Sequence, residues 1–132
     1  MSTQSSMSND GPSTGHIHHL ALSPEWHAAL SGDRLYRRSS IDRTLEQEGF
    51  VHCSFPEQVQ RTADKYYRDR SDVVLLTIEP SLVDAEIRHE NTTGGTELFP
   101  HVYGPIPVDA VVAARPVALL EDGTLDIGDA LG

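Results

Sequence analysis

The chain has 132 residues, of which 38% are hydrophobic, and a formal net charge of -10. This length suits one domain with one modest core, and no apolar run approaches the roughly 20 residues that a membrane span needs. The acidic excess argues against general binding to nucleic acid, which depends on clustered Lys and Arg. The single cysteine, Cys53, excludes an internal disulfide and a zinc site built from several cysteines.

The two ends of the chain differ in composition from its middle. Residues 1–15 are rich in Ser, Thr, Asn, Gly and Pro, so they cannot bury enough surface to offset their loss of conformational entropy. We predict a disordered tail there, without the basic and apolar regions of a signal peptide, which indicates a cytoplasmic protein. We expect one domain over residues 16–121 and a frayed acidic tail over residues 122–132.

The first half of the domain is predicted to contain short strands and helices. The apolar segment 17–22 predicts a strand, and Ser23 as N-cap with Pro24 at the first helical position predicts a helix after it. Residues 33–48 predict a loop with a short helix at its end. A second strand is expected over residues 49–54.

The second half contains the clearest periodic signals. Pro56 opens a helix with an amphipathic stripe, and the apolar run 73–78 predicts a central strand covered on both faces. Further strands are expected at residues 86–90 and 108–118. Because strands and helices do not alternate regularly, the fold class is α+β with a largely antiparallel sheet.

The stretch 94–105, GGTELFPHVYGP, has the densest chemistry in the chain. Its glycines and prolines disfavour a helix, so we expect a loop that presents Glu97, His101 and Tyr103. Glu97 could act as a base or stabilise positive charge on a sugar carbon, although a lone loop carboxylate is more often solvated. Tyr103 could stack on a ligand ring or anchor the loop.

Two histidines, His19 and His52, lie within the predicted strands. A buried imidazole must find a hydrogen-bond partner, so each is either a satisfied core residue or part of a site. A neutral ring suits recognition of ribose hydroxyls or proton transfer near neutral pH. Since neighbouring strand residues project to opposite faces, His52 shares a face with Ser54 and not with Cys53, which argues against thiol catalysis.

Seven histidines raise the question of a metal site. His19, His52, His101 and Glu97 could supply ligands for zinc or iron. No ligand motif of known spacing supports such a site, so no metal is expected.

The basic residues are concentrated in one segment. Eight of the ten lie between Arg34 and Arg70. Such a segment could hold a phosphate-bearing small molecule, and Arg37 and Arg38 beside two serines could bind phosphate. A solvated helix face is the commoner explanation of such a run.

Three segments, IHHL at 17–20, EGFVHCS at 48–54 and GTELFPHVYGP at 95–105, resemble the bacterial domain-of-unknown-function family 952. That family is similar in fold to ADP-ribosyltransferases. The resemblance therefore implies an α+β, ADP-ribosyltransferase-like domain with two small, mostly antiparallel sheets and two main helices around a nucleotide cleft.

The same resemblance implies roles for individual residues. His19 would hydrogen-bond a ribose hydroxyl of NAD, and His52 with Ser54 would correspond to the second-strand motif. Glu97 would hold the nicotinamide ribose and favour an oxocarbenium-like state. Because His52 stands where Tyr or Ser is commoner, phosphate-bearing RNA ends and other nucleotides stay open as ligands.

The leading hypothesis is a small cytoplasmic enzyme, or former enzyme, that binds NAD or a related nucleotide as a possible substrate, without membrane or general nucleic-acid partners. The alternatives are a non-catalytic ligand-binding or regulatory module and a metal-dependent hydrolase; the sequence does not define an oligomeric state. The candidate catalytic residues are Glu97, His19 and His52, and the candidate binding residues are His19, His52, Ser54, Tyr103, His101 and Arg37.

Overall fold

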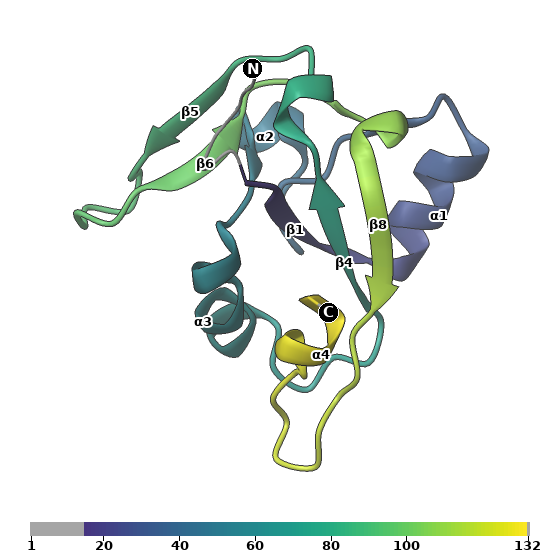
Figure 1. The fold of residues 1–132 in the computed structure, drawn as a ribbon, viewed down its shortest axis with the longest axis vertical. Helices are drawn as coiled ribbons and strands as arrows, with labels where there is room; N and C mark the ends of the chain where they lie inside the picture. The colour runs from purple at the N-terminus through teal and green to yellow at the C-terminus, as the bar shows by residue number, and fades with distance from the viewer. Residues whose placement is uncertain (1–14, 132) are drawn as a thin grey trace, which may run out of the picture.

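The computed structural model describes residues 15–131, so most of the segment predicted to be a disordered tail lies outside the described residues. Within them the chain forms four α-helices and three antiparallel sheets (Figure 1). The elements are β1 Ile17–Leu22, α1 Ser23–Ser31, β2 Leu35–Tyr36, α2 Leu45–Glu48, β3 Val51–His52, α3 Pro56–Tyr66, β4 Val73–Ile78, β5 Ile87–Glu90, β6 Phe99–Val102, β7 Ile106–Pro107, β8 Val111–Pro116 and α4 Ile127–Leu131, with 3-10 turns at Pro80–Leu82 and Val108–Ala110.

The sheets have the strand orders β1-β4-β8, β3-β6-β5 and β2-β7, and all pairings are antiparallel. The α+β class is confirmed, although the fold has one small sheet more than the two expected. None of the helices in residues 15–131 is both long and apolar enough to cross a membrane.

Strand β4 is the centre of the first sheet, as its continuous apolar run predicts. Its side chains alternate, so Leu75 and Leu76 face opposite sides, and both are at most 1% exposed. On the Leu76 side the core includes Trp26 of α1 and Tyr36 of β2. On the Leu75 side it is closed by residues of α3 and α4. Two hydrophobic clusters therefore hold the sheet between them.

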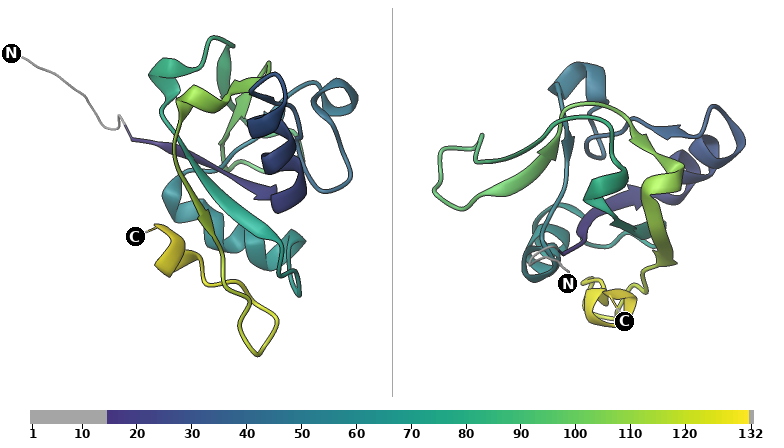
Figure 2. Two further views of the ribbon diagram at one scale, coloured as in Figure 1. Left: turned by 90° about the vertical axis from the view of Figure 1, so that its right-hand side faces the viewer. Right: turned by 45° about the horizontal axis from the view of Figure 1, so that its top comes forward.

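Residues 122–131 of the C-terminal segment pack against the rest of the chain, which corrects the expectation of a frayed tail there. Leu125, Ile127 and Ala130 are buried and pack in the same cluster as Val59 and Ala63 of α3. The last turn of chain lies beside α3 in the views of Figures 1 and 2. Its acidic residues remain on the outside. The acidic composition of this segment therefore pointed to a frayed tail, although its few apolar residues form one face of the short helix α4.

The stretch 94–105 is only partly a loop, which is a second correction. Phe99–Val102 forms β6, the middle strand of the β3-β6-β5 sheet. Pro100 is tolerated there because β3 ends opposite it: the Pro100 carbonyl accepts the backbone N–H of Cys53 at 3.0 Å, one residue after β3. His101 therefore stands on a strand and has a fixed direction.

The second sheet is attached to the first through one backbone bridge. His18 and Ser54 exchange two N–H to O hydrogen bonds of 2.8 Å, which connect β1 to the segment that follows β3. From this joint the β5–β6 hairpin extends away from the central sheet (Figure 2, right). The candidate site lies between this hairpin and α3.

Candidate functional site

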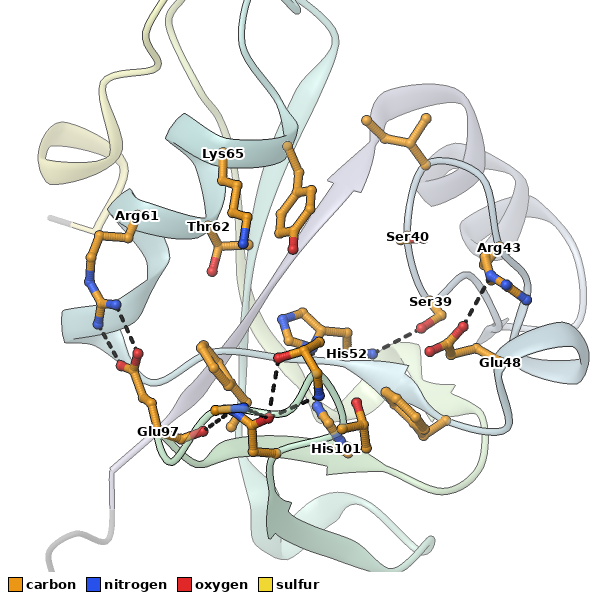
Figure 3. A pocket seen from close by; sticks show the side chains of 18 of the residues that line it. Ser39, Ser40, Arg43, Glu48, His52, Arg61, Thr62, Lys65, Glu97 and His101 are labelled. Carbon is orange, nitrogen blue, oxygen red and sulfur yellow. Dashed lines mark hydrogen bonds and ion pairs between the residues drawn. The ribbon is translucent and has the colours of Figure 1, made fainter.

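A cavity of about 690 Å³ opens between the second sheet and α3. Its walls are the loop 39–43, the helix α3, the strands β3 and β6, and the loop between β5 and β6. This volume lies within the range of roughly 300–1,000 Å³ that is usual for sites of small molecules. Figure 3 shows His52 and His101 in the middle of the site, with Arg61, Thr62 and Lys65 on one side and Ser39, Arg43 and Glu48 on another.

His52 contributes a half-buried imidazole to the cavity. Its backbone N–H donates to Ser39 Oγ at 3.3 Å, and its Nδ1 lies 3.1 Å from His101 Nε2. Among residues 15–131 its Nε2 has no hydrogen-bond partner. Burial, and then the neighbouring rings of His101 and His19, lower the pKa of His52 to about 4. At neutral pH this ring is uncharged and can accept a hydrogen bond.

His101 forms the floor behind His52 and is 1% exposed. Its ring stacks on Phe50 with centroids 4.0 Å apart, and its Nδ1 lies 3.1 Å from Glu90 Oε1. The Tyr103 hydroxyl donates to the same carboxylate oxygen, and these contacts lower the pKa of Glu90, the Tyr103 bond most. The site thus has a line of hydrogen bonds from the cavity to a carboxylate.

Glu97 lines the cavity at its other end, where it is held by α3. Its carboxylate forms two bonds with the Arg61 guanidinium, at 2.8 and 2.5 Å, and accepts Gln58 Nε2 at 3.1 Å. The Arg61 bonds, and then the Gln58 bond, lower the pKa of Glu97 to about 2. The loop behind it is tied by Asn91, whose Nδ2 donates to the Glu97 carbonyl at 2.7 Å. Glu97 is therefore a fixed negative charge and a poor proton acceptor.

The basic segment supplies three cations to the cavity: Arg43, Arg61 and Lys65. Arg43 pairs with Glu48 at 3.2 Å and Arg61 with Glu97. Lys65 forms no ion pair within residues 15–131, and its Nζ lies 5.3 Å from the centre of the Tyr66 ring. One cation of the cavity is thus free for an anionic ligand group.

His19 was predicted to be in the site, but it lies in the core behind it. The ring is 3% exposed, its Nδ1 lies 2.7 Å from the His52 carbonyl oxygen, and its Nε2 lies 3.3 Å from the Tyr36 hydroxyl. Burial lowers the pKa of His19 to about 4. Both ring nitrogens are satisfied, so His19 supports the backbone of β3 and does not line the cavity.

Three further predicted binding residues also lie away from the cavity lining. Ser54 is buried and its Oγ lies 3.4 Å from Thr62 Oγ1. Tyr103 donates to Glu90, and the Arg88 guanidinium lies over its ring. Arg37 pairs with Asp33 at 2.8 Å. Of the candidate site residues, the structure brings together His52, His101 and Glu97.

The strand-parity argument about Cys53 agrees with the structure. Cys53 is 1% exposed in the core, and burial raises the pKa of its thiol, whereas His52 and Phe50 both face the cavity. In the part of the chain described, no three side chains of His, Cys, Asp or Glu are grouped so as to hold a metal ion.

Several residues of the site escaped the sequence analysis. Glu90 had no signal of its own, because its contact with His101 depends on the pairing of β5 with β6. Arg61 and Lys65 were noted only as members of a basic segment. Gln58 had a local signal, as the third residue of α3 capping the Phe55 N–H at 2.9 Å. Its amide also donates to Glu97 and to the Leu98 carbonyl, 39 and 40 residues away, which no local signal shows.

The comparison with protein families gives one assignment. Residues 20–114 match the family described as "Protein of unknown function (DUF952)". The chain belongs to the DUF952 family.

The DUF952 chain is also similar to solved structures. It is 33% identical to protein CC0527 from Caulobacter crescentus in a crystal structure, with a TM-score of 0.76 over 88% of this chain and 97% of that one. A solution NMR structure of CC0527 gives 32% identity and a TM-score of 0.72, over 89% and 98%. No curated protein matches the sequence. These comparisons establish the family; the likeness to ADP-ribosyltransferases stays a prediction.

Proposed function

We propose that this DUF952 protein binds a nucleotide of the NAD or ADP-ribose class in the cavity and acts on it as an ADP-ribosyltransferase-like enzyme. The observation that carries the proposal is that two groups line the same cavity. They are His52, with a free ring nitrogen, and Glu97, a carboxylate held in its charged form. A neutral imidazole suits a ribose hydroxyl. A fixed negative charge suits the positive charge that develops on a sugar carbon.

The rest of the lining supports a nucleotide as the ligand. Lys65 offers an uncommitted positive charge for a phosphate, and the hydroxyls of Ser40 and Thr62 offer hydrogen bonds. Tyr66 and Phe99 provide aromatic surface on which a base could stack. Charge, hydroxyl groups and aromatic rings are the three chemistries that phosphate, ribose and base require.

A second candidate, a non-catalytic ligand-binding module on the same fold, is favoured by the Arg61–Glu97 pair. Both carboxylate oxygens of Glu97 are already bonded to Arg61. In this alternative Glu97 shapes the cavity wall and only the binding function is retained.

Calorimetric titration with NAD and with ADP-ribose, followed by mass spectrometry for released nicotinamide, tests both candidates. We expect His52→Ala to weaken binding at least tenfold, whereas His27→Ala, an exposed histidine of α1, should bind as the wild type does. If Glu97→Gln stops nicotinamide release and keeps binding, the enzyme proposal holds. Binding without any release by the wild type would favour the module, and no binding at millimolar ligand would refute the enzyme proposal.

A further inference from the structure

The cavity is connected to a carboxylate outside it by a chain of side-chain hydrogen bonds. His52 Nδ1 lies 3.1 Å from His101 Nε2, and His101 Nδ1 lies 3.1 Å from Glu90 Oε1. The register of the second sheet creates this line. His52 pairs directly with His101 across β3 and β6, and Glu90 lies on β5 two residues from Arg88, the other partner of His101.

The central ring of these hydrogen bonds is almost completely shielded from water. His101 is 1% exposed and stacked on Phe50. Both of its nitrogens are bonded inside the protein, so its two bonds constrain each other: a neutral imidazole donates from one nitrogen and accepts at the other. The orientation of one bond therefore sets the orientation of the next.

The Glu90 carboxylate fixes the donor and acceptor direction of this series of hydrogen bonds. Glu90 accepts the Tyr103 hydroxyl as well as the His101 ring, and both contacts favour its charged form, which can only accept. His101 must then carry a proton on Nδ1, and in its neutral form it accepts at Nε2. His52 in turn donates from Nδ1, which leaves a lone pair on Nε2.

We propose that His101 and Glu90 are positioning residues that fix His52 as the proton acceptor of the cavity. The group that donates to His52 Nε2 is then a hydroxyl of the ligand or a water molecule. This inference rests on the proposed function for its substrate, because it names the acceptor in a transfer from an NAD-type nucleotide as an O–H nucleophile. A carboxylate nucleophile, which has no proton to give and would need a donor or a cation at this point, is disfavoured.

The proton balance of such a transfer is complete with these residues. The oxygen of the O–H group forms a bond to the ribose carbon, the bond from that carbon to nicotinamide breaks, and neutral nicotinamide leaves with the electron pair. The proton of the nucleophile passes to His52 Nε2 and then to solvent when the product departs. A weak base is sufficient, because an oxygen that has just bonded to a cationic sugar carbon is strongly acidic. The Glu90 charge, acting through His101, stabilises the imidazolium in the meantime.

Nitrogen-15 NMR of the histidine rings tests the inference without any ligand. On the full chain near pH 8, we expect His52 to show a protonated Nδ1 and an unprotonated Nε2, and His101 to show the same tautomer. The signals are assigned with His52→Ala and His101→Gln. In Glu90→Ala, the fraction of His52 with unprotonated Nε2 should fall, while Glu121→Ala, which removes an exposed carboxylate in the turn before α4, should match the wild type.

A proton on His52 Nε2 in the wild type, with a doubly protonated His101 or with the opposite tautomer, would overturn the inference. So would a Glu90→Ala spectrum in which His52 keeps the wild-type tautomer. The measurement is independent of nucleotide binding. A protein with the expected tautomers and no nicotinamide release would refute the proposed function alone, and one that releases nicotinamide with the opposite tautomers would refute this inference alone.

Discussion

Acidification is expected to destabilise this fold through His19, because the ring is buried without charge. It is 3% exposed and bonded to the His52 carbonyl and the Tyr36 hydroxyl. Burial lowers its pKa from 6.5 to about 4. Between these two pH values the unfolded chain binds a proton that the folded chain does not. The contribution of His19 is therefore fully present above pH 6.5 and is lost as the pH falls towards 4.

The size of the effect follows from the shift. A change from 6.5 to about 4 corresponds to about 3 kcal/mol of unfolding free energy, and about 2 kcal/mol of it is already lost at pH 5. Domains of this size are stable by roughly 5–15 kcal/mol, so the loss is measurable. His18 and His52, whose pKa values burial also lowers to about 4, add to the acid sensitivity of the wild type.

Urea unfolding near pH 7.5 and near pH 5 isolates the His19 contribution. The His19→Gln variant keeps an amide that can donate and accept but cannot titrate. It should be less stable than the wild type near pH 7.5, yet lose about 2 kcal/mol less on acidification. His27→Gln, at an exposed position of α1, controls for the substitution. Equal losses in the wild type and in His19→Gln would refute the reasoning.

Two further predictions concern packing. Ile127 is 1% exposed in the cluster between α3 and the central sheet, so Ile127→Ala should lower the free energy of unfolding by about 2–4 kcal/mol. Leu131→Ala, at a side chain 38% exposed, should change the urea midpoint little. Similar losses in both variants would contradict the packing of α4. Cys53, 1% exposed and with its pKa raised by burial, should react with a thiol reagent only after unfolding; rapid labelling of the native protein would contradict its placement.

Local sequence signals were sufficient for elements whose burial pattern is set by their own residues. The apolar run 73–78 forms a strand with the expected bounds, and the helix expected after Pro56 begins at that residue. Local signals failed where the conformation of a segment depends on the distant segments it pairs with. Pro100 argued for a loop, but it occupies a strand because β3 ends opposite it. The segment 122–131 is acidic, and its few apolar residues form a buried helix face only because they pack against α3 and β4.

The same limit applies to the site. Strand parity correctly separated His52 from Cys53, because the direction of alternate side chains is a local property. Whether a strand histidine faces a cavity or the core is not local. His19 points to Tyr36 because β2 covers that face of β1, and no feature of residues 17–22 specifies this. Likewise, the partners of Glu97 are 36 and 39 residues away, on α3.

The most direct test of the account is a heteronuclear NMR titration of the wild-type chain with ADP-ribose. The account predicts saturable shifts of the His52 ring and of the backbone signals of Ser39, Thr62 and Lys65, all of which line the cavity. Signals of residues that do not line the cavity, such as Trp26 of α1, should stay in place. Shifts that avoid the cavity, or no shifts at millimolar ADP-ribose, would contradict the claim that this cavity is a nucleotide site.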